Sequence, residues 1–254
     1  MLNRIVHGTD TGAPPLVIAH GLFGSARNWG VIARRLSDRG RVVAVDMRNH
    51  GDSPWSERQG YEEMAADLSG VIAAQGGTAD VLGHSMGGKA AMVLALTDPA
   101  RVRRLIVADI APVAYGHSQS HLIEAMRAVD LSDVTRRSEA DAQLAAHIET
   151  PGVRAFHLQS LDAAEQRWKL NLDALAAEMD RIIGWPDVDG RFEGPALFLS
   201  GGESDYVRRA HRDRIRALFP KARFASIPGA GHWLHAEKPR EFEAAVRTFL
   251  ETEF

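Results

Sequence analysis

Ser85 is the residue whose neighbours indicate chemistry most directly. It lies in Gly83-His84-Ser85-Met86-Gly87, between an apolar run that ends at Leu82 and an Ala-rich segment. A serine at a sharp strand-to-helix turn exposes its hydroxyl, and the flanking glycines let the two elements pack closely. The start of the following helix supplies oriented N–H groups that favour developing negative charge. This context predicts that Ser85 is a nucleophile for acyl transfer.

A serine hydroxyl is a weak nucleophile at neutral pH and needs a base within hydrogen-bond reach. The sequence contains eleven histidines, of which His232 follows the last strand-like run. It belongs to the glycine-rich segment Gly229-Ala230-Gly231-His232-Trp233, which is flexible enough to bring an imidazole over Ser85. We therefore predict that His232 is the general base.

Other histidines have simpler explanations. His84 flanks the nucleophile and is expected to pack beneath it, while His20 and His50 lie in turns and are expected to satisfy backbone groups. His117 and His121 have the i, i+4 spacing of a helical metal pair, but no third ligand is evident. The sequence therefore predicts no metal site.

An oxyanion hole requires two backbone donors aimed at the carbonyl oxygen under attack. The N–H of Met86 directly follows the nucleophile and is the first predicted donor. The second is expected from His20-Gly21-Leu22-Phe23-Gly24, a glycine-rich loop that follows the apolar run Leu16–Ala19. The N–H of Leu22 is the preferred donor, and that of Phe23 is the alternative.

A carboxylate that orients the histidine completes a serine triad. Asp109 ends the apolar run Leu105–Ala108, and Asp205 lies in the turn after the run Ala196–Leu199. Both fit the chain order of serine, acid and histidine, so the residues alone leave the two candidates open.

These residues require a scaffold that brings distant segments together. Short apolar runs alternate with helix-like segments in the first half, which is typical of a mostly parallel sheet flanked by helices. The predicted strands are Leu16–Ala19, Arg41–Val45, Asp80–Leu82, Leu105–Ala108, Ala196–Leu199 and Arg223–Ile227, and the predicted helices cover about 28–38, 61–75, 86–98 and 239–250. The fold class is therefore predicted to be α/β.

Residues 113–191 contain no strand-like run and indicate helices separated by breaks such as Thr150-Pro151-Gly152. We predict an inserted helical cap at 113–191, with 1–112 and 192–254 forming the core domain. One apolar stripe with three- and four-residue spacing comprises Leu172, Leu175, Ala176, Met179, Ile182 and Ile183.

Substrate-binding side chains are expected on loops at the catalytic edge and on the cap. Phe23 and Trp233 are the loop candidates and Trp168 is the cap candidate, which together predict a pocket for a short or medium acyl chain. Arg48 and Lys89 are expected to be solvated or structural rather than ligands of an acidic substrate.

Composition narrows the functional class further. The 254 residues carry a net charge of -3, which provides no basic field for nucleic acid, so a small molecule is the expected partner. The absence of cysteine excludes disulfides, thiolate–zinc sites and cysteine nucleophiles. The N-terminus lacks the apolar core of a signal peptide, and no stretch approaches the roughly 20 apolar residues that span a bilayer. We predict a cytoplasmic protein without a membrane span, and the sequence leaves the oligomeric state open.

Several motifs together resemble the α/β-hydrolase superfamily, and others resemble its YbfF-like esterases more narrowly. The superfamily resemblance rests on His20-Gly21, Asp46-Met47-Arg48-Asn49-His50-Gly51-Asp52-Ser53, Gly83-His84-Ser85-Met86-Gly87-Gly88 and Gly231-His232. The narrower resemblance rests on Asp109-Ile110-Ala111-Pro112-Val113, Gly201-Gly202-Glu203-Ser204-Asp205-Tyr206-Val207 and Gly231-His232-Trp233-Leu234-His235-Ala236-Glu237-Lys238-Pro239.

The resemblance implies an α/β-hydrolase fold and a small serine esterase with a helical cap, an acyl-enzyme intermediate and no cofactor. It also implies that Asp109 is the triad acid, because the position matching Asp205 is often not acidic in YbfF-like enzymes. Ser204 matches a serine that supports the histidine there. A thioesterase and a carbon–carbon bond hydrolase or lyase are the alternatives within the same fold, and a non-catalytic binding protein is a further one.

Overall fold

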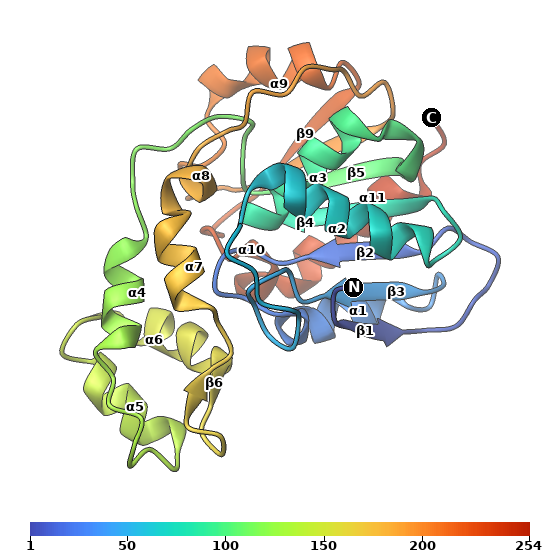
Figure 1. The fold of residues 1–254 in the computed structure, drawn as a ribbon. Coiled ribbons are helices and arrows are strands. Elements are labelled where there is room, and N and C mark those ends of the chain that lie inside the picture. The colour runs from blue at the N-terminus through green and yellow to red at the C-terminus, as the bar shows by residue number, and fades with distance from the viewer.

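Seven strands form the central sheet, in the order β1-β3-β2-β4-β5-β8-β9, in a computed structural model that describes all 254 residues (Figure 1). β1 pairs antiparallel with β3, and the remaining neighbours are parallel. The strands are β1 (Arg4–His7), β2 (Leu16–Ala19), β3 (Val42–Val45), β4 (Ala79–His84), β5 (Val102–Ala108), β8 (Ala196–Gly201) and β9 (Ala222–Ile227).

All six predicted strands are present, and β1 is an additional edge strand. Its four residues, Arg4–His7, alternate between exposed and half-buried, so they lack the continuous apolar run by which the buried strands are recognised. The inner strands run parallel, as expected for the α/β fold predicted from the sequence.

Helices cover both faces of the sheet, which explains why β2, β3 and β4 are buried along their whole length. α2, α3 and α9 pack on one face, and α1 and α11 pack on the other (Figure 1). The helices are α1 (Gly30–Leu36), α2 (Tyr61–Ala73), α3 (Met86–Thr97), α9 (Arg212–Leu218), α10 (Leu234–Glu237) and α11 (Pro239–Glu251), with 3-10 turns at Ala26–Trp29, Pro99–Arg101, Leu158–Ser160 and Arg209–His211.

Local sequence determines where two of these helices begin or end. α3 ends at Thr97 because Pro99 disfavours a helical conformation at Asp98, whose φ is -139°. α11 begins with Pro239, at a position where the missing N–H would have had no helical partner.

The segment 113–191 lies beside the sheet and contains five helices (Figure 1). They are α4 (Ser120–Arg127), α5 (Arg137–Leu144), α6 (Pro151–His157), α7 (Leu172–Ala177) and α8 (Met179–Ile183). The prediction that this segment has no strand is wrong, because β6 (Leu161–Asp162) and β7 (Arg167–Trp168) form a short hairpin. Two-residue strands are too short to produce a recognisable alternation. We call residues 113–191 the cap, and its status as a separate domain stays a prediction.

The apolar stripe of the cap continues over two helices rather than one. Glu178 separates α7 from α8, with a φ of -98° and a ψ of 9°. Its carboxylate accepts the Gln59 N–H at 3.1 Å, which connects the break to the core domain. Leu175, Met179 and Ile182 on either side of this break are buried, as the stripe predicts.

The carboxyl ends of the inner strands meet at one edge of the sheet. The Ser85 N–H donates to Ala108 O at 3.0 Å, and the Asp109 N–H donates to Leu199 O at 2.9 Å. These bonds continue the parallel ladder past the ends of β4 and β5 and set Ser85 and Asp109 on adjacent strands. None of the helices is both long and apolar enough to cross a bilayer.

Candidate active site

Ser85 occupies a strained turn between β4 and α3. Its φ of 52° and ψ of -119° lie in a region that residues with a side chain rarely adopt. The turn is possible because its neighbours lack a β-carbon, which at Gly83 would lie 2.3 Å from Gly87 O and at Gly87 2.4 Å from Ala19 O. The strain is therefore supported by close packing on both sides of the serine.

His232 lies between Ser85 and Asp109. Its Nε2 is 3.1 Å from Ser85 Oγ, and its Nδ1 is 2.7 Å from Asp109 Oδ2. A proton on Nδ1 donates to the carboxylate and leaves Nε2 free to accept the serine proton, which is the arrangement that a serine nucleophile requires. Residues separated by 147 and 123 positions in the chain therefore meet at one imidazole.

Asp109 is the carboxylate that His232 contacts. It is fully buried, has a φ of 53°, and accepts the Gly201 N–H at 3.0 Å through Oδ1. Its Oδ2 accepts the Ser204 hydroxyl in addition to the His232 N–H. The Asp205 side chain is exposed and makes no contact with the histidine. Of the two acids that the chain order left open, the structure therefore brings Asp109, and not Asp205, to His232.

The two loop amides predicted as alternative oxyanion donors differ in their partners. The Phe23 N–H donates to His50 Nε2 at 3.1 Å, so it is already occupied. The N–H groups of Leu22 and Met86 have no hydrogen-bond partner within the chain. The structure therefore leaves the Leu22 and Met86 amides available to a ligand beside Ser85.

Two buried histidines, His20 and His50, bond to backbone groups, as predicted. His20 Nδ1 lies 2.7 Å from Gly21 O, and its Nε2 accepts the Met47 N–H at 2.9 Å. His50 Nδ1 lies 2.8 Å from Arg48 O, which fixes the tautomer that accepts from Phe23. Burial, reinforced by the neighbouring His20, lowers the pKa of His50 to about 3, so this ring is neutral at physiological pH.

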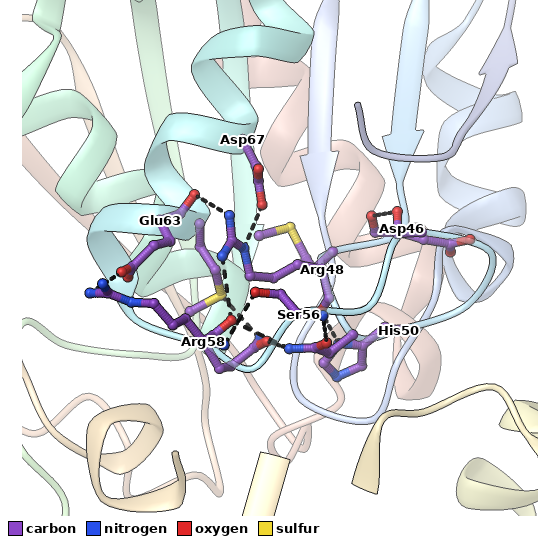
Figure 2. Close-up of polar contacts among 12 residues, drawn as sticks. Asp46, Arg48, His50, Ser56, Arg58, Glu63 and Asp67 are labelled. Carbon is purple, nitrogen blue, oxygen red and sulfur yellow. Dashed lines mark hydrogen bonds and ion pairs between the residues drawn. The ribbon is translucent and has the colours of Figure 1, made fainter. Parts of the chain in front are cut away.

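Arg48 anchors the loop that carries His50, and Figure 2 shows it beside Asp67 and Glu63 of α2. Its Nε donates to Asp67 Oδ2 at 2.6 Å, and its two terminal nitrogens donate to the Arg58 and Glu63 carbonyls. With its donors engaged inside the chain, Arg48 has the structural role that was expected of it.

A cavity of about 620 Å³ opens at Ser85 between the sheet edge and the cap. Fifteen of its 31 lining residues are hydrophobic, which suits an apolar ligand with a few polar groups. Phe23 and Trp233 line it, as predicted. Trp168 does not, because its indole is buried within the cap and donates to Met126 O at 2.9 Å. The assignment of Trp168 as a substrate-binding residue is therefore wrong.

Lys89 is buried at the wall of this cavity, one helical turn after Ser85. Its ammonium donates to the Ile183 carbonyl at 2.9 Å and to the Gly184 carbonyl at the end of α8. Its nitrogen also lies 4.9 Å from the centroid of the Tyr115 ring. Burial lowers the pKa of Lys89 to about 7. The expected structural role fits these contacts, which join the core domain to the cap.

Tyr206 is a residue of the site that sequence reasoning missed. Its ring stacks on His232, with centroids 4.0 Å apart and planes at 19°. Its position two residues after Ser204, within the motif Gly201–Val207 that resembles the YbfF-like esterases, was the one signal in the sequence that could have identified it. His117, considered above as half of a metal pair, instead contacts the Tyr206 hydroxyl through Nε2 at 2.8 Å.

His84 lies directly below the catalytic edge, as predicted from its position beside Ser85. Burial and the nearby His232 lower its pKa well below the usual histidine value, so it is neutral at physiological pH. Its Nε2 lies 2.8 Å from the His232 carbonyl and donates to it, which holds the backbone of His232 in place.

A parallel sheet with a serine, a histidine and an aspartate at its carboxyl edge defines the α/β-hydrolase class of protein. The model described as "Alpha/beta hydrolase family" matches residues 16–245, and the chain belongs to that family. The predicted fold and the predicted family are therefore both confirmed.

Three similar proteins cover nearly the whole chain. The chain is 43% identical to the esterase YbfF of Escherichia coli over 93% of its own length and 92% of that protein. It is 44% identical to the sn-1-specific diacylglycerol lipase ABHD11 of Mus musculus, over 95% of the chain and 82% of that protein. A solved structure described as a marine microorganism esterase aligns with a TM-score of 0.92 and 38% identity, covering 98% of both chains.

Proposed function

We propose that this protein is a serine esterase that cleaves carboxylic esters through an acyl-enzyme intermediate. Ser85 is the nucleophile, His232 the general base and acid, and Asp109 the carboxylate that orients the base. The observation that carries the proposal is the single imidazole that reaches both Ser85 Oγ at 3.1 Å and Asp109 Oδ2 at 2.7 Å. The names of its relatives, an esterase and a diacylglycerol lipase, support carboxylic ester hydrolysis.

The reaction begins when Ser85 Oγ attacks the ester carbonyl carbon and transfers its proton to His232 Nε2. Asp109 keeps its negative charge and stabilises the imidazolium. The tetrahedral intermediate then expels the alcohol, which takes the proton from Nε2, and Ser85 retains the acyl group. A water molecule repeats the sequence, giving its proton to His232, and releases the carboxylic acid with the serine hydroxyl restored.

The amides of Leu22 and Met86 are proposed as the donors that stabilise the oxyanion. Both lack a partner within the chain, whereas the Phe23 amide is engaged by His50. A preorganised pair of N–H donors needs no rearrangement as charge develops, and one such donor typically contributes 10²–10³ in kcat. Ser204 supports the acid, because its hydroxyl donates to the same Asp109 oxygen that His232 contacts.

The cavity favours short- to medium-chain esters as substrates. A volume of about 620 Å³, with Phe23 and Trp233 in the wall, accommodates an acyl chain together with a small alcohol. We propose that residues 113–191 act as the cap that separates this cavity from solvent. A cytoplasmic location stays a prediction that rests on the cysteine-free composition.

Hydrolysis assays on a panel of substrates test this proposal. The panel comprises p-nitrophenyl esters of increasing chain length, a diacylglycerol, acyl-CoA thioesters and dienone acids. We expect turnover of the esters, with an optimum at short or medium chains, and labelling by a fluorophosphonate that is lost in Ser85→Ala. Turnover of thioesters or dienone acids alone would replace the ester assignment with one of the two alternative reactions. An unlabelled protein that turns over none of them would be a binding protein.

A further inference from the structure

The two hydrogen bonds of His232 engage its ring nitrogens and leave the faces of the ring to be held by packing. Asp109 contacts Nδ1 and Ser85 contacts Nε2. A turn of the ring about the Cβ–Cγ bond would carry the nitrogens away from these partners. The Tyr206 ring lies against one face of the imidazole, with centroids 4.0 Å apart and planes inclined by 19°, where it opposes that turn by direct contact.

Tyr206 is itself held at both ends of its backbone. Its N–H donates to Ser204 Oγ at 3.3 Å, and Ser204 in turn donates to Asp109. Its carbonyl accepts the Tyr115 hydroxyl at 2.7 Å, while the same hydroxyl accepts the Ala111 N–H at 2.9 Å. The stacked ring is therefore fixed relative to the carboxylate that orients the histidine.

We propose that Tyr206 is a positioning residue whose ring face holds the His232 imidazole in plane and stabilises the imidazolium formed during the reaction. The proposal rests on the proposed function, in which His232 takes the Ser85 proton. The face of an aromatic ring is electronegative and attracts a cation placed over it, and it does so more strongly in a partly desolvated site. Tyr206 therefore interacts more favourably with the protonated ring than with the neutral one.

Several titratable groups lie around this histidine and its partner, among them Tyr115, whose hydroxyl donates to the Tyr206 carbonyl. Asp109 accepts from Nδ1, and the His84 ring lies 4.8 Å from the His232 ring with planes at 41°. His235 is buried behind His84, and burial lowers its pKa to about 3, so it stays neutral. His117 reaches Tyr206 from the cap through the phenol oxygen, on the exposed side. Among these groups, Asp109 is the only carboxylate in contact with the imidazole.

Two substitutions separate the ring face from the hydroxyl of Tyr206. Tyr206→Phe keeps the stacked ring and removes the bond to His117, whereas Tyr206→Leu keeps apolar bulk and removes the ring. Each variant is assayed for kcat, KM and the pH dependence of kcat/KM with p-nitrophenyl butyrate, and its thermal unfolding is recorded. His117→Phe is the matched control for the loss of the hydroxyl contact. If Tyr206→Leu does not fold, Tyr206→Met provides the same comparison.

We expect Tyr206→Phe and His117→Phe to stay within about twofold of the unmodified enzyme. Tyr206→Leu should lower kcat about 3- to 10-fold with little change in KM, because only the imidazolium of the transition state loses its partner. The acidic limb of its kcat/KM profile should move to lower pH by about half a unit, because the free imidazole then protonates less readily. A loss of general packing would lower kcat without moving this limb in that direction.

Three results would overturn the proposal. One is a Tyr206→Leu enzyme with unchanged kcat and pH profile, and the second is a kcat loss with an unmoved acidic limb. The third is an equal loss in Tyr206→Phe, which would assign the effect to the hydroxyl. Failure of the proposed function is recognised separately, as an unmodified protein that neither cleaves esters nor reacts with fluorophosphonate.

Discussion

Replacing Asp109 with asparagine should abolish most of the activity while leaving the fold intact. The carboxylate is fully buried and accepts three hydrogen bonds, from the Gly201 N–H, the Ser204 hydroxyl and the His232 N–H. An amide of the same shape keeps one oxygen for the first of these. Its NH₂ group, placed where Oδ2 lies, repels the proton on His232 Nδ1.

The magnitude follows from the tautomer that the asparagine imposes. An NH₂ donor facing Nδ1 favours the imidazole with its proton on Nε2, which then cannot accept the Ser85 proton. In serine hydrolases this substitution costs about 10⁴ in kcat, equivalent to about 5.4 kcal/mol of transition-state stabilisation. Asp205→Asn is the matched control, because the Asp205 side chain is exposed, and we expect its kcat to change less than twofold.

Hydrolysis of p-nitrophenyl butyrate by the two variants measures the difference, and thermal unfolding monitors the fold. The reasoning would be refuted if Asp109→Asn kept more than a tenth of the activity, or if Asp205→Asn carried the larger loss with its fold intact. Either result would mean that the contact between Asp109 and His232 does not orient the base.

Three further predictions concern stability. Gly87→Ala should unfold the protein or lower its stability by about 3 kcal/mol, at the upper end of the usual cost of core overpacking, because its β-carbon would lie 2.4 Å from Ala19 O. Gly70→Ala, in α2 with open space around it, should instead stabilise the protein by roughly 0.5–1 kcal/mol. Urea titrations of the two variants measure both changes. His50 and His235 are neutral when folded, with pKa values lowered by burial to about 3, and titrate near 6.5 when unfolded. The free energy of unfolding should be highest above about pH 6.5 and fall toward pH 3, because the unfolded chain then binds protons that the folded protein excludes. The loss should be about 2 kcal/mol per histidine between pH 6.5 and pH 5. Urea midpoints at both pH values measure this loss, and a flat dependence would contradict the burial of these rings as neutral groups.

The strained turn at Ser85 could be located from the sequence because its requirements are local. A strained turn at Ser85 needs glycines at fixed offsets, and an apolar strand and a helix must flank it, all within about ten residues of chain. The buried strands were recognisable for a similar reason, since a strand covered on both faces must be apolar throughout. His232 required one further inference, from its position after the last strand.

The order along the chain could not decide between Asp109 and Asp205, because both follow a strand. The preference for Asp109 rested on the family resemblance, and the physical difference between the two acids is a contact with His232 across 123 residues of chain. The choice between Leu22 and Phe23 as oxyanion donor depends in the same way on His50, whose ring nitrogen accepts the Phe23 N–H.

Tertiary packing alone also decided the roles of two aromatic residues. Trp168 resembles a pocket residue by type, yet it is buried within the cap, while Tyr206 carries no pattern of its own and stacks on His232. The sequence by itself determined which elements form and where the serine turn lies, because short-range sterics and apolar burial are encoded residue by residue. The partners of His232 and the wall of the cavity were decided by tertiary structure, because they depend on distances between segments that are remote in the chain.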